Sequence, residues 1–81
     1  MTIAVLFFAQ ARERAGRTSI TIELPEGSRV SDALALLGRD HPALADLWPH
    51  LAVAVNQRLA RPESLLAHGA ELALLPPVSG G

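Results

Sequence analysis

The 81-residue chain contains no cysteine, no lysine and no tyrosine. Without cysteine it has no disulfide bond and no thiolate chemistry. All seven basic residues are arginines, which stay protonated near neutral pH and do not act as amine nucleophiles. We therefore expect the N-terminus to be the only primary amine of the protein. Copies of the protein cannot be joined to one another through lysine side chains. The arginine bias of a GC-rich genome would explain the same composition without a functional reason.

The chain also has no large excess of positive or negative charge and no long apolar run. The net charge is −1, and the chain has no basic run and no aromatic platform, which argues against binding to nucleic acid. The longest apolar stretch, residues 3–9, is too short to span a membrane, and it lacks the basic lead and the cleavage site of a signal peptide. We expect a cytosolic protein. The three histidines, 41, 50 and 68, lack metal-ligand spacing, so no metal site is predicted.

Apolar residues, in contrast, are plentiful for so short a chain. They make up 49% of the residues, and the mean hydropathy is +0.27. The length allows one domain with a modest core, so an enclosed substrate pocket is not expected. We expect part of the apolar surface to be exposed as a partner site; packing of Ala and Leu in the core is the alternative.

Periodicity predicts an α+β domain with the order β-β-α-β-β-β. Apolar residues that follow the twofold period of strands lie at 3–8, 18–24, 51–56, 58–60 and 70–75. A helix is predicted from the apolar face formed by Val30, Ala33, Leu34 and Leu37, with Gly38 and His41-Pro42 at its end. The helix should pack on one face of a mixed sheet, in which the first and last strands are parallel neighbours.

The segments between these elements carry weaker signals. Residues 9–16 read as a polar connector that can hold a helical turn ending at Gly16. Ser28 or Ser31 is a candidate helix cap, and residues 42–48 can form a second short helical turn. Asn56-Gln57 is a candidate tight turn because asparagine tolerates a positive φ.

The C-terminal residues carry the chemistry. Pro76 and Pro77 end the last strand, because proline cannot donate a hydrogen bond to a neighbouring strand. A Pro-Pro segment is also stiff and extended, so the chain leaves the strand in a fixed direction. We predict a domain over residues 1–77 and a flexible tail over residues 78–81. A Gly-Gly end has no side-chain bulk, so Gly80 and Gly81 can thread a narrow channel of another protein.

The α-carboxylate of Gly81 is a poor acyl donor unless it is activated, most simply by ATP as an acyl-adenylate. The chain has no recognisable nucleotide loop, so a partner must bind the ATP, and no cofactor is expected on the chain itself. Attack by sulfide or a persulfide would then produce a thiocarboxylate. Attack by a thiol and then by an amine would produce an isopeptide. An idle, frayed terminus is the third possibility.

The sequence resembles the family of molybdopterin synthase small subunits, which are ubiquitin-like sulfur carriers with the β-grasp fold. The matching segments are Leu6-Phe7-Phe8-Ala9, Arg12-Glu13 with Gly16, Ala54-Val55-Asn56, and Gly69 to Leu75 followed by Pro-Pro-Val-Ser-Gly-Gly. The family often has Asp where His68 and Ala70 stand, and an aromatic residue near Leu74 and Leu75. Its thiamine-pathway relatives share the Gly-Gly end but usually lack the Phe-Phe-Ala segment and the paired prolines.

The resemblance implies a mechanism without catalytic side chains on this chain. A partner similar to ubiquitin-activating enzymes adenylates Gly81, and sulfur transfer converts it to a thiocarboxylate. The tail, through Pro77, Val78, Ser79 and Gly80, then enters the large synthase subunit and donates sulfur to cyclic pyranopterin monophosphate. The expected assembly is a heterotetramer with two subunits of each kind. A thiamine-type carrier and a ubiquitin-like protein modifier are the alternatives.

Alternation also predicts a docking patch. If Ile3, Val5 and Phe7 face the helix together with Leu72 and Leu74, then Phe8 and Leu75 share the opposite face, near Leu59. These three residues are the predicted patch; the alternative exchanges the two faces.

Four polar residues near strand ends are either part of the interface or simply solvated: Arg12, Glu13, Asn56 and Arg58.

Overall fold

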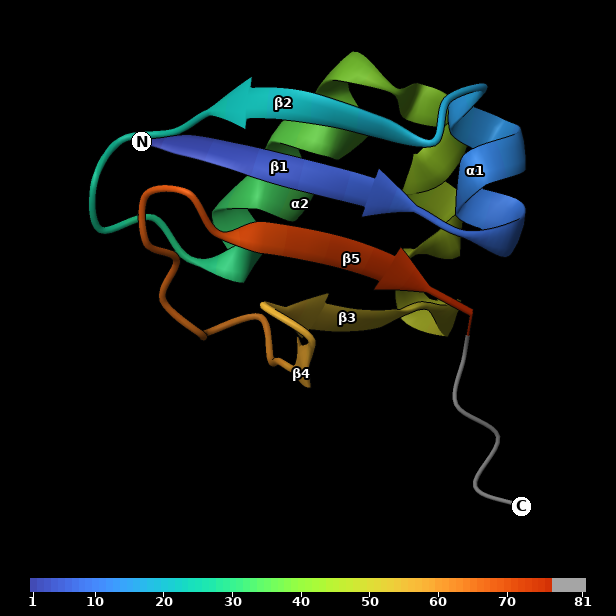
Figure 1. Ribbon diagram of the computed structural model, residues 1–81. Coiled ribbons are helices and arrows are strands. Elements are labelled where there is room, and N and C mark those ends of the chain that lie inside the picture. Colours follow the sequence, from blue (N-terminus) through green and yellow to red (C-terminus); the bar gives the residue numbers. More distant parts are fainter. Residues whose placement is uncertain (77–81) are drawn as a thin grey trace.

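The computed structural model describes residues 1–76, and five strands form one mixed sheet in it (Figure 1). The strands are β1 (Thr2–Phe7), β2 (Ser19–Glu23), β3 (Ala52–Val55), β4 (Arg58–Leu59) and β5 (Glu71–Leu75). Their order across the sheet is β2-β1-β5-β3-β4. β1 and β5 are parallel, and the other pairs are antiparallel. The predicted parallel pairing of the first and last strands is therefore confirmed, and β2 lies at an edge as its half-polar pattern indicates.

Helices cover one face of this sheet. They are α1 (Ala9–Ala15), α2 (Val30–Asp40) and the 3₁₀ helix η1 (Pro42–His50). In Figure 1, α2 crosses behind the sheet, and α1 lies at the end where β1 finishes. Within the described residues, none of these helices is both long and apolar enough to cross a membrane.

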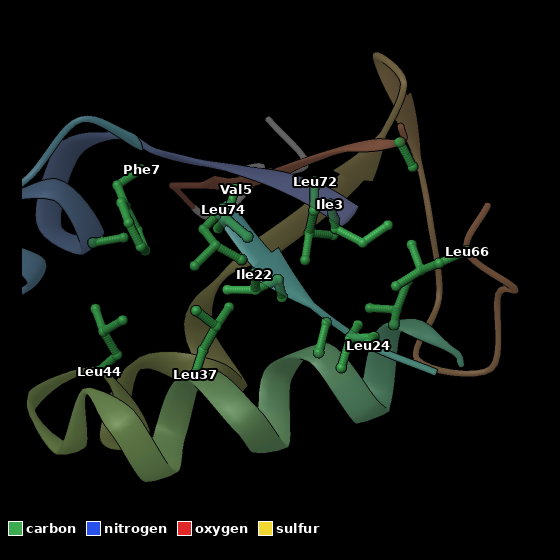
Figure 2. Close-up of a cluster of buried hydrophobic side chains, with 14 of the residues drawn as sticks. Ile3, Val5, Phe7, Ile22, Leu24, Leu37, Leu44, Leu66, Leu72 and Leu74 are labelled. Atoms are coloured by element: carbon green, nitrogen blue, oxygen red, sulfur yellow. The ribbon is translucent and has the colours of Figure 1, made fainter. Parts of the chain in front are cut away.

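The core lies between α2 and the sheet. Figure 2 shows Leu37 and Leu44 on the helical side, with their side chains directed toward those of the strands. On β1 and β5, the predicted inward residues are at most 2% exposed: Ile3, Val5, Phe7, Leu72 and Leu74. The exchanged-face alternative is therefore wrong, because these five side chains lie under the helices.

The prediction for residues 9–16, the segment between β1 and β2, needs correction. Residues 9–15 form a helix rather than a connector with a single turn, so β1 and β2 pair as neighbours but are not joined by a short turn. Gly16 takes φ 72° and caps α1, with its N–H donating to the Arg12 carbonyl. The sequence pattern underestimated this helix because only one of its residues, Ala11, is buried.

The ends of α2 also differ from the prediction. Neither serine is its N-cap: Arg29 holds that position, and its backbone N–H donates to Asp32 Oδ2 at 2.8 Å. Ser28 Oγ donates instead to the Pro25 carbonyl. Gly38 lies inside the helix, which continues to Asp40. Glycine suits this position because a side chain would meet Trp48: an ideal Cβ at residue 38 lies 3.3 Å from Nε1 of that indole.

The turn before β5 forms without the aspartates of the family pattern. Gly69 has φ 82°, and its N–H donates to the Thr2 carbonyl. Nδ1 of His68 accepts a hydrogen bond from the Thr2 N–H at 3.0 Å. An imidazole nitrogen therefore serves as an acceptor for the N-terminal end of β1.

Candidate docking face and C-terminal end

The face of the sheet opposite the helices carries a row of apolar side chains. In the register, Leu6 and Ala54 both pair with Ala73, Ala54 also pairs with Leu59, and Ala52 pairs with Leu75. Side chains of directly paired residues lie on the same face of a sheet. Because Phe7 and Leu74 are paired and buried, these other pairs must lie on the uncovered face.

These side chains surround a shallow hollow of about 350 Å³, here called the open-face hollow. Its lining comes from β1, β3, β4, β5 and the residues that flank them: Leu6, Phe8, Ala54, Gln57, Leu59, Glu71, Ala73 and Leu75. The structure thus brings together Phe8, Leu59 and Leu75, the three residues of the predicted patch. Phe8 is 42% exposed and Leu59 is 70% exposed, which are large values for apolar side chains. The role of this patch in docking stays a prediction.

Local backbone features place Phe8 and Leu59 on this face. Phe8 follows β1, and its N–H donates to the Leu74 carbonyl at 3.2 Å. The next residue, Ala9, has φ 50°, so the chain turns sharply into α1 as soon as Phe8 has left the strand. Leu59 is presented by the turn at Asn56 and Gln57, where φ is 51° and 69°. Two consecutive positive φ values are typical of the tight hairpin turns that match strand twist.

Asn56 has a structural role in this turn. Its side-chain Oδ1 accepts from the Glu71 N–H, and its own N–H donates to the Glu71 carbonyl, both at 2.9 Å. The turn is thereby fastened to the beginning of β5. The other predicted polar candidates, Arg12, Glu13 and Arg58, are exposed.

The sequence prediction omitted most of the lining. Leu6 and Ala73 follow the same alternation as Phe8 and Leu75, so the twofold period alone could have found them. Glu71 also follows this alternation, since it lies two residues before Ala73. Gln57 has no such signal, because it reaches the hollow only through the turn at Asn56 and Gln57.

The last described residues direct the chain out of the sheet beside this hollow. β5 lies between β1 and β3 and ends at Leu75, and Pro76 is exposed. Since β1 and β5 are parallel, their ends lie at the same end of the sheet, and Phe8 is therefore close to the point where the chain leaves (Figure 1). The residues predicted to be loaded or threaded, Pro77, Val78, Ser79, Gly80 and Gly81, lie outside the described residues.

No group of three or more His, Asp or Glu side chains in residues 1–76 could hold a metal ion. The described ion pairs are exposed ones, such as Arg14 with Asp46 at 3.1 Å, which ties α1 to η1. The open-face hollow is suited to contact with an apolar protein surface and offers no evident acid–base pair.

Comparisons with known proteins agree with this architecture. A model described as the ThiS family matches residues 5–81. The molybdopterin synthase sulfur carrier subunit of Chlamydomonas reinhardtii is 42% identical over an alignment that covers 100% of both chains.

Two solved structures are also similar. The crystal structure of SAMP1 from Haloferax volcanii has a TM-score of 0.87 and 35% identity, with 100% of both chains covered. The complex of subunits 1 and 2 of the molybdopterin-converting factor from Helicobacter pylori contains a chain with a TM-score of 0.73 and 26% identity, again with complete coverage of both chains. The chain therefore belongs to the ThiS family, and it has the ubiquitin-like β-grasp fold of these similar structures.

Proposed function

We propose that this chain is the sulfur carrier subunit of molybdopterin synthase. One observation carries the proposal: β5 directs the chain toward a Pro-Pro-Val-Ser-Gly-Gly end from a point beside an exposed apolar hollow. A carrier needs both features, a terminus that can enter another protein and a surface that holds that protein in place. The full-length similarity to a named sulfur carrier subunit supports the same function.

In the proposed cycle the Gly81 carboxylate first attacks the α-phosphorus of ATP on a separate activating enzyme, and pyrophosphate leaves. Sulfide then attacks the carbonyl carbon of the resulting acyl-adenylate, and AMP leaves as the thiocarboxylate forms. In the synthase the thiocarboxylate sulfur forms a bond to a carbon of cyclic pyranopterin monophosphate and displaces an oxygen substituent. Water then hydrolyses the resulting thioester, which leaves the sulfur on the pterin and regenerates the carboxylate of Gly81. ATP is used by the activating partner, and this chain binds no cofactor in the scheme.

The chain supplies no catalytic side chain in this scheme and is proposed to be a non-enzymatic subunit. Its contribution is to present the tail, while the open-face hollow docks the large subunit. The similar chain in the Helicobacter pylori complex of subunits 1 and 2 supports a partner of this kind. We propose a heterotetramer with two subunits of each kind, acting in the cytosol.

Intact-mass analysis tests the function directly. The full chain is incubated with an adenylating enzyme of the ubiquitin-activating type, ATP and sulfide. We expect its mass to rise by the difference between one sulfur and one oxygen atom. A matched variant with one alanine appended after Gly81 should keep its fold and show no such gain. If the wild-type mass stays unchanged while the enzyme adenylates another carrier, the proposal is wrong.

A protein modifier is the second candidate, and the similarity to the archaeal modifier SAMP1 favours it. It uses the same activated terminus but transfers Gly81 to lysines of other proteins. Lysine-linked conjugates that carry this chain, found in cell extracts without any thiocarboxylate form, would favour the modifier. A thiocarboxylate without conjugates would reject it.

A further inference from the structure

A second apolar hollow lies at the edge of the sheet, between α2 and β3. It has a volume of about 260 Å³ and is here called the edge groove. Its walls come from α2, η1, β3 and the residues after β4, and include Leu34, Trp48, Leu51, Val53, Leu59 and Pro62. None of its lining residues is charged.

The short length of β4 leaves this groove open. β4 has only two residues and pairs with Ala54 and Val55. The Ala60 N–H continues the pairing by donating to the Val53 carbonyl at 2.8 Å, and Pro62 follows soon after. Trp48, Leu51 and Val53 therefore pack against the core on one side but remain only half-buried.

The edge groove and the open-face hollow adjoin at the edge of the sheet. Leu59 lines both of them. Ala52, another lining residue of the groove, pairs with Leu75, the last residue of β5 and part of the open-face hollow. A partner surface that extends past Leu59 from the open face therefore meets the groove.

We infer that the edge groove is a second contact site for the large synthase subunit, which would place an apolar side chain in it. The inference rests on the proposed function and adds a contact beyond the open face. The groove is uncharged, and large half-buried side chains line it, so water would leave apolar surface when a partner enters. Trp48 forms part of its wall, and it is the only tryptophan of the chain.

That single tryptophan allows a direct test. The full chain is labelled with 5-fluorotryptophan, so Trp48 contributes its only fluorine signal, and unlabelled cognate large subunit is added. We expect the signal to shift in the complex. If size-exclusion chromatography shows the complex while the signal stays at its free position, the groove is not occupied and only this inference fails. If the wild-type chain forms no complex with the large subunit, the proposed function and this inference fail together.

Variants separate the two contact sites. Leu34→Gln changes a groove residue, Phe8→Ala changes the open-face hollow alone, and Leu65→Gln is the control, since Leu65 is 62% exposed and lines neither hollow. We expect Leu34→Gln and Phe8→Ala each to raise the dissociation constant by about tenfold, and Leu65→Gln to change it less than about twofold. Normal binding by a folded Leu34→Gln variant would overturn the inference. The fluorine experiment on the wild-type side chains decides the question if that variant does not fold.

Discussion

Replacement of Leu59 by alanine should weaken the complex with the large subunit without harming the fold. Leu59 lies on the two-residue strand β4 and is 70% exposed in the free chain. The substitution removes Cγ and both Cδ atoms, which would contribute about 2.4 kcal/mol if they were buried completely. Because 70% of the residue is exposed before binding, about 1.7 kcal/mol of this is available at the interface.

That free energy corresponds to an increase of about 15-fold in the dissociation constant. Isothermal titration calorimetry with the large subunit measures it. The free energy of unfolding, measured with urea, should change by less than about 0.5 kcal/mol because the side chain is on the surface. Leu65→Ala is the matched control, since Leu65 is 62% exposed but lines neither hollow, and its dissociation constant should equal that of the wild type. An unchanged affinity for Leu59→Ala would refute the assignment of Leu59 to the interface.

Four further substitutions test the fold and its two faces. Phe7→Ala should lower the free energy of unfolding by about 3–5 kcal/mol in urea denaturation, because Phe7 is 2% exposed. Phe8→Ala should lower it by less than about 1 kcal/mol, because Phe8 is 42% exposed. Similar losses for the two variants would mean that the faces are misassigned. Gly38→Leu should lower the free energy of unfolding by about 1–3 kcal/mol, since the new side chain meets the indole of Trp48. Unfolding followed by tryptophan fluorescence measures this loss, and unchanged stability would contradict the packing of Gly38 against Trp48. Gln57→Gly should raise stability by about 0.5–1 kcal/mol, because Gln57 has φ 69° and glycine adopts that conformation without strain; a loss in thermal denaturation would argue against the turn.

Periodicity correctly predicted the strands and the main helix because their patterns are strong. Ile20, Ile22 and Leu24 alternate with polar residues and lie on the inward side, as expected. On the predicted apolar face of α2, Val30, Ala33 and Leu37 are buried, and Leu34 is half-buried. The pattern failed at α1, because a seven-residue helix with one buried side chain has almost no apolar period to detect.

The end of α2 shows a different limit. The sequence pattern predicts that the helix ends at Gly38, because glycine is common just after helices. In the structure it is the contact point for Trp48, ten residues further along the chain. Local rules cannot distinguish these two uses of glycine, because the second depends on a tertiary neighbour.

Composition and spacing along the chain are enough to predict the chemistry available to this protein and the alternation of its strands. The absence of cysteine and lysine and the Gly-Gly end are visible without any fold, and the twofold and 3.6-residue periods follow from the geometry of a single chain. The hollow that Phe8, Leu59 and Leu75 line together, and the groove beside it, become visible only in the folded chain. The reason is physical: these contacts depend on the register between distant strands and on how soon β4 ends, and neither is encoded in the pattern of one segment.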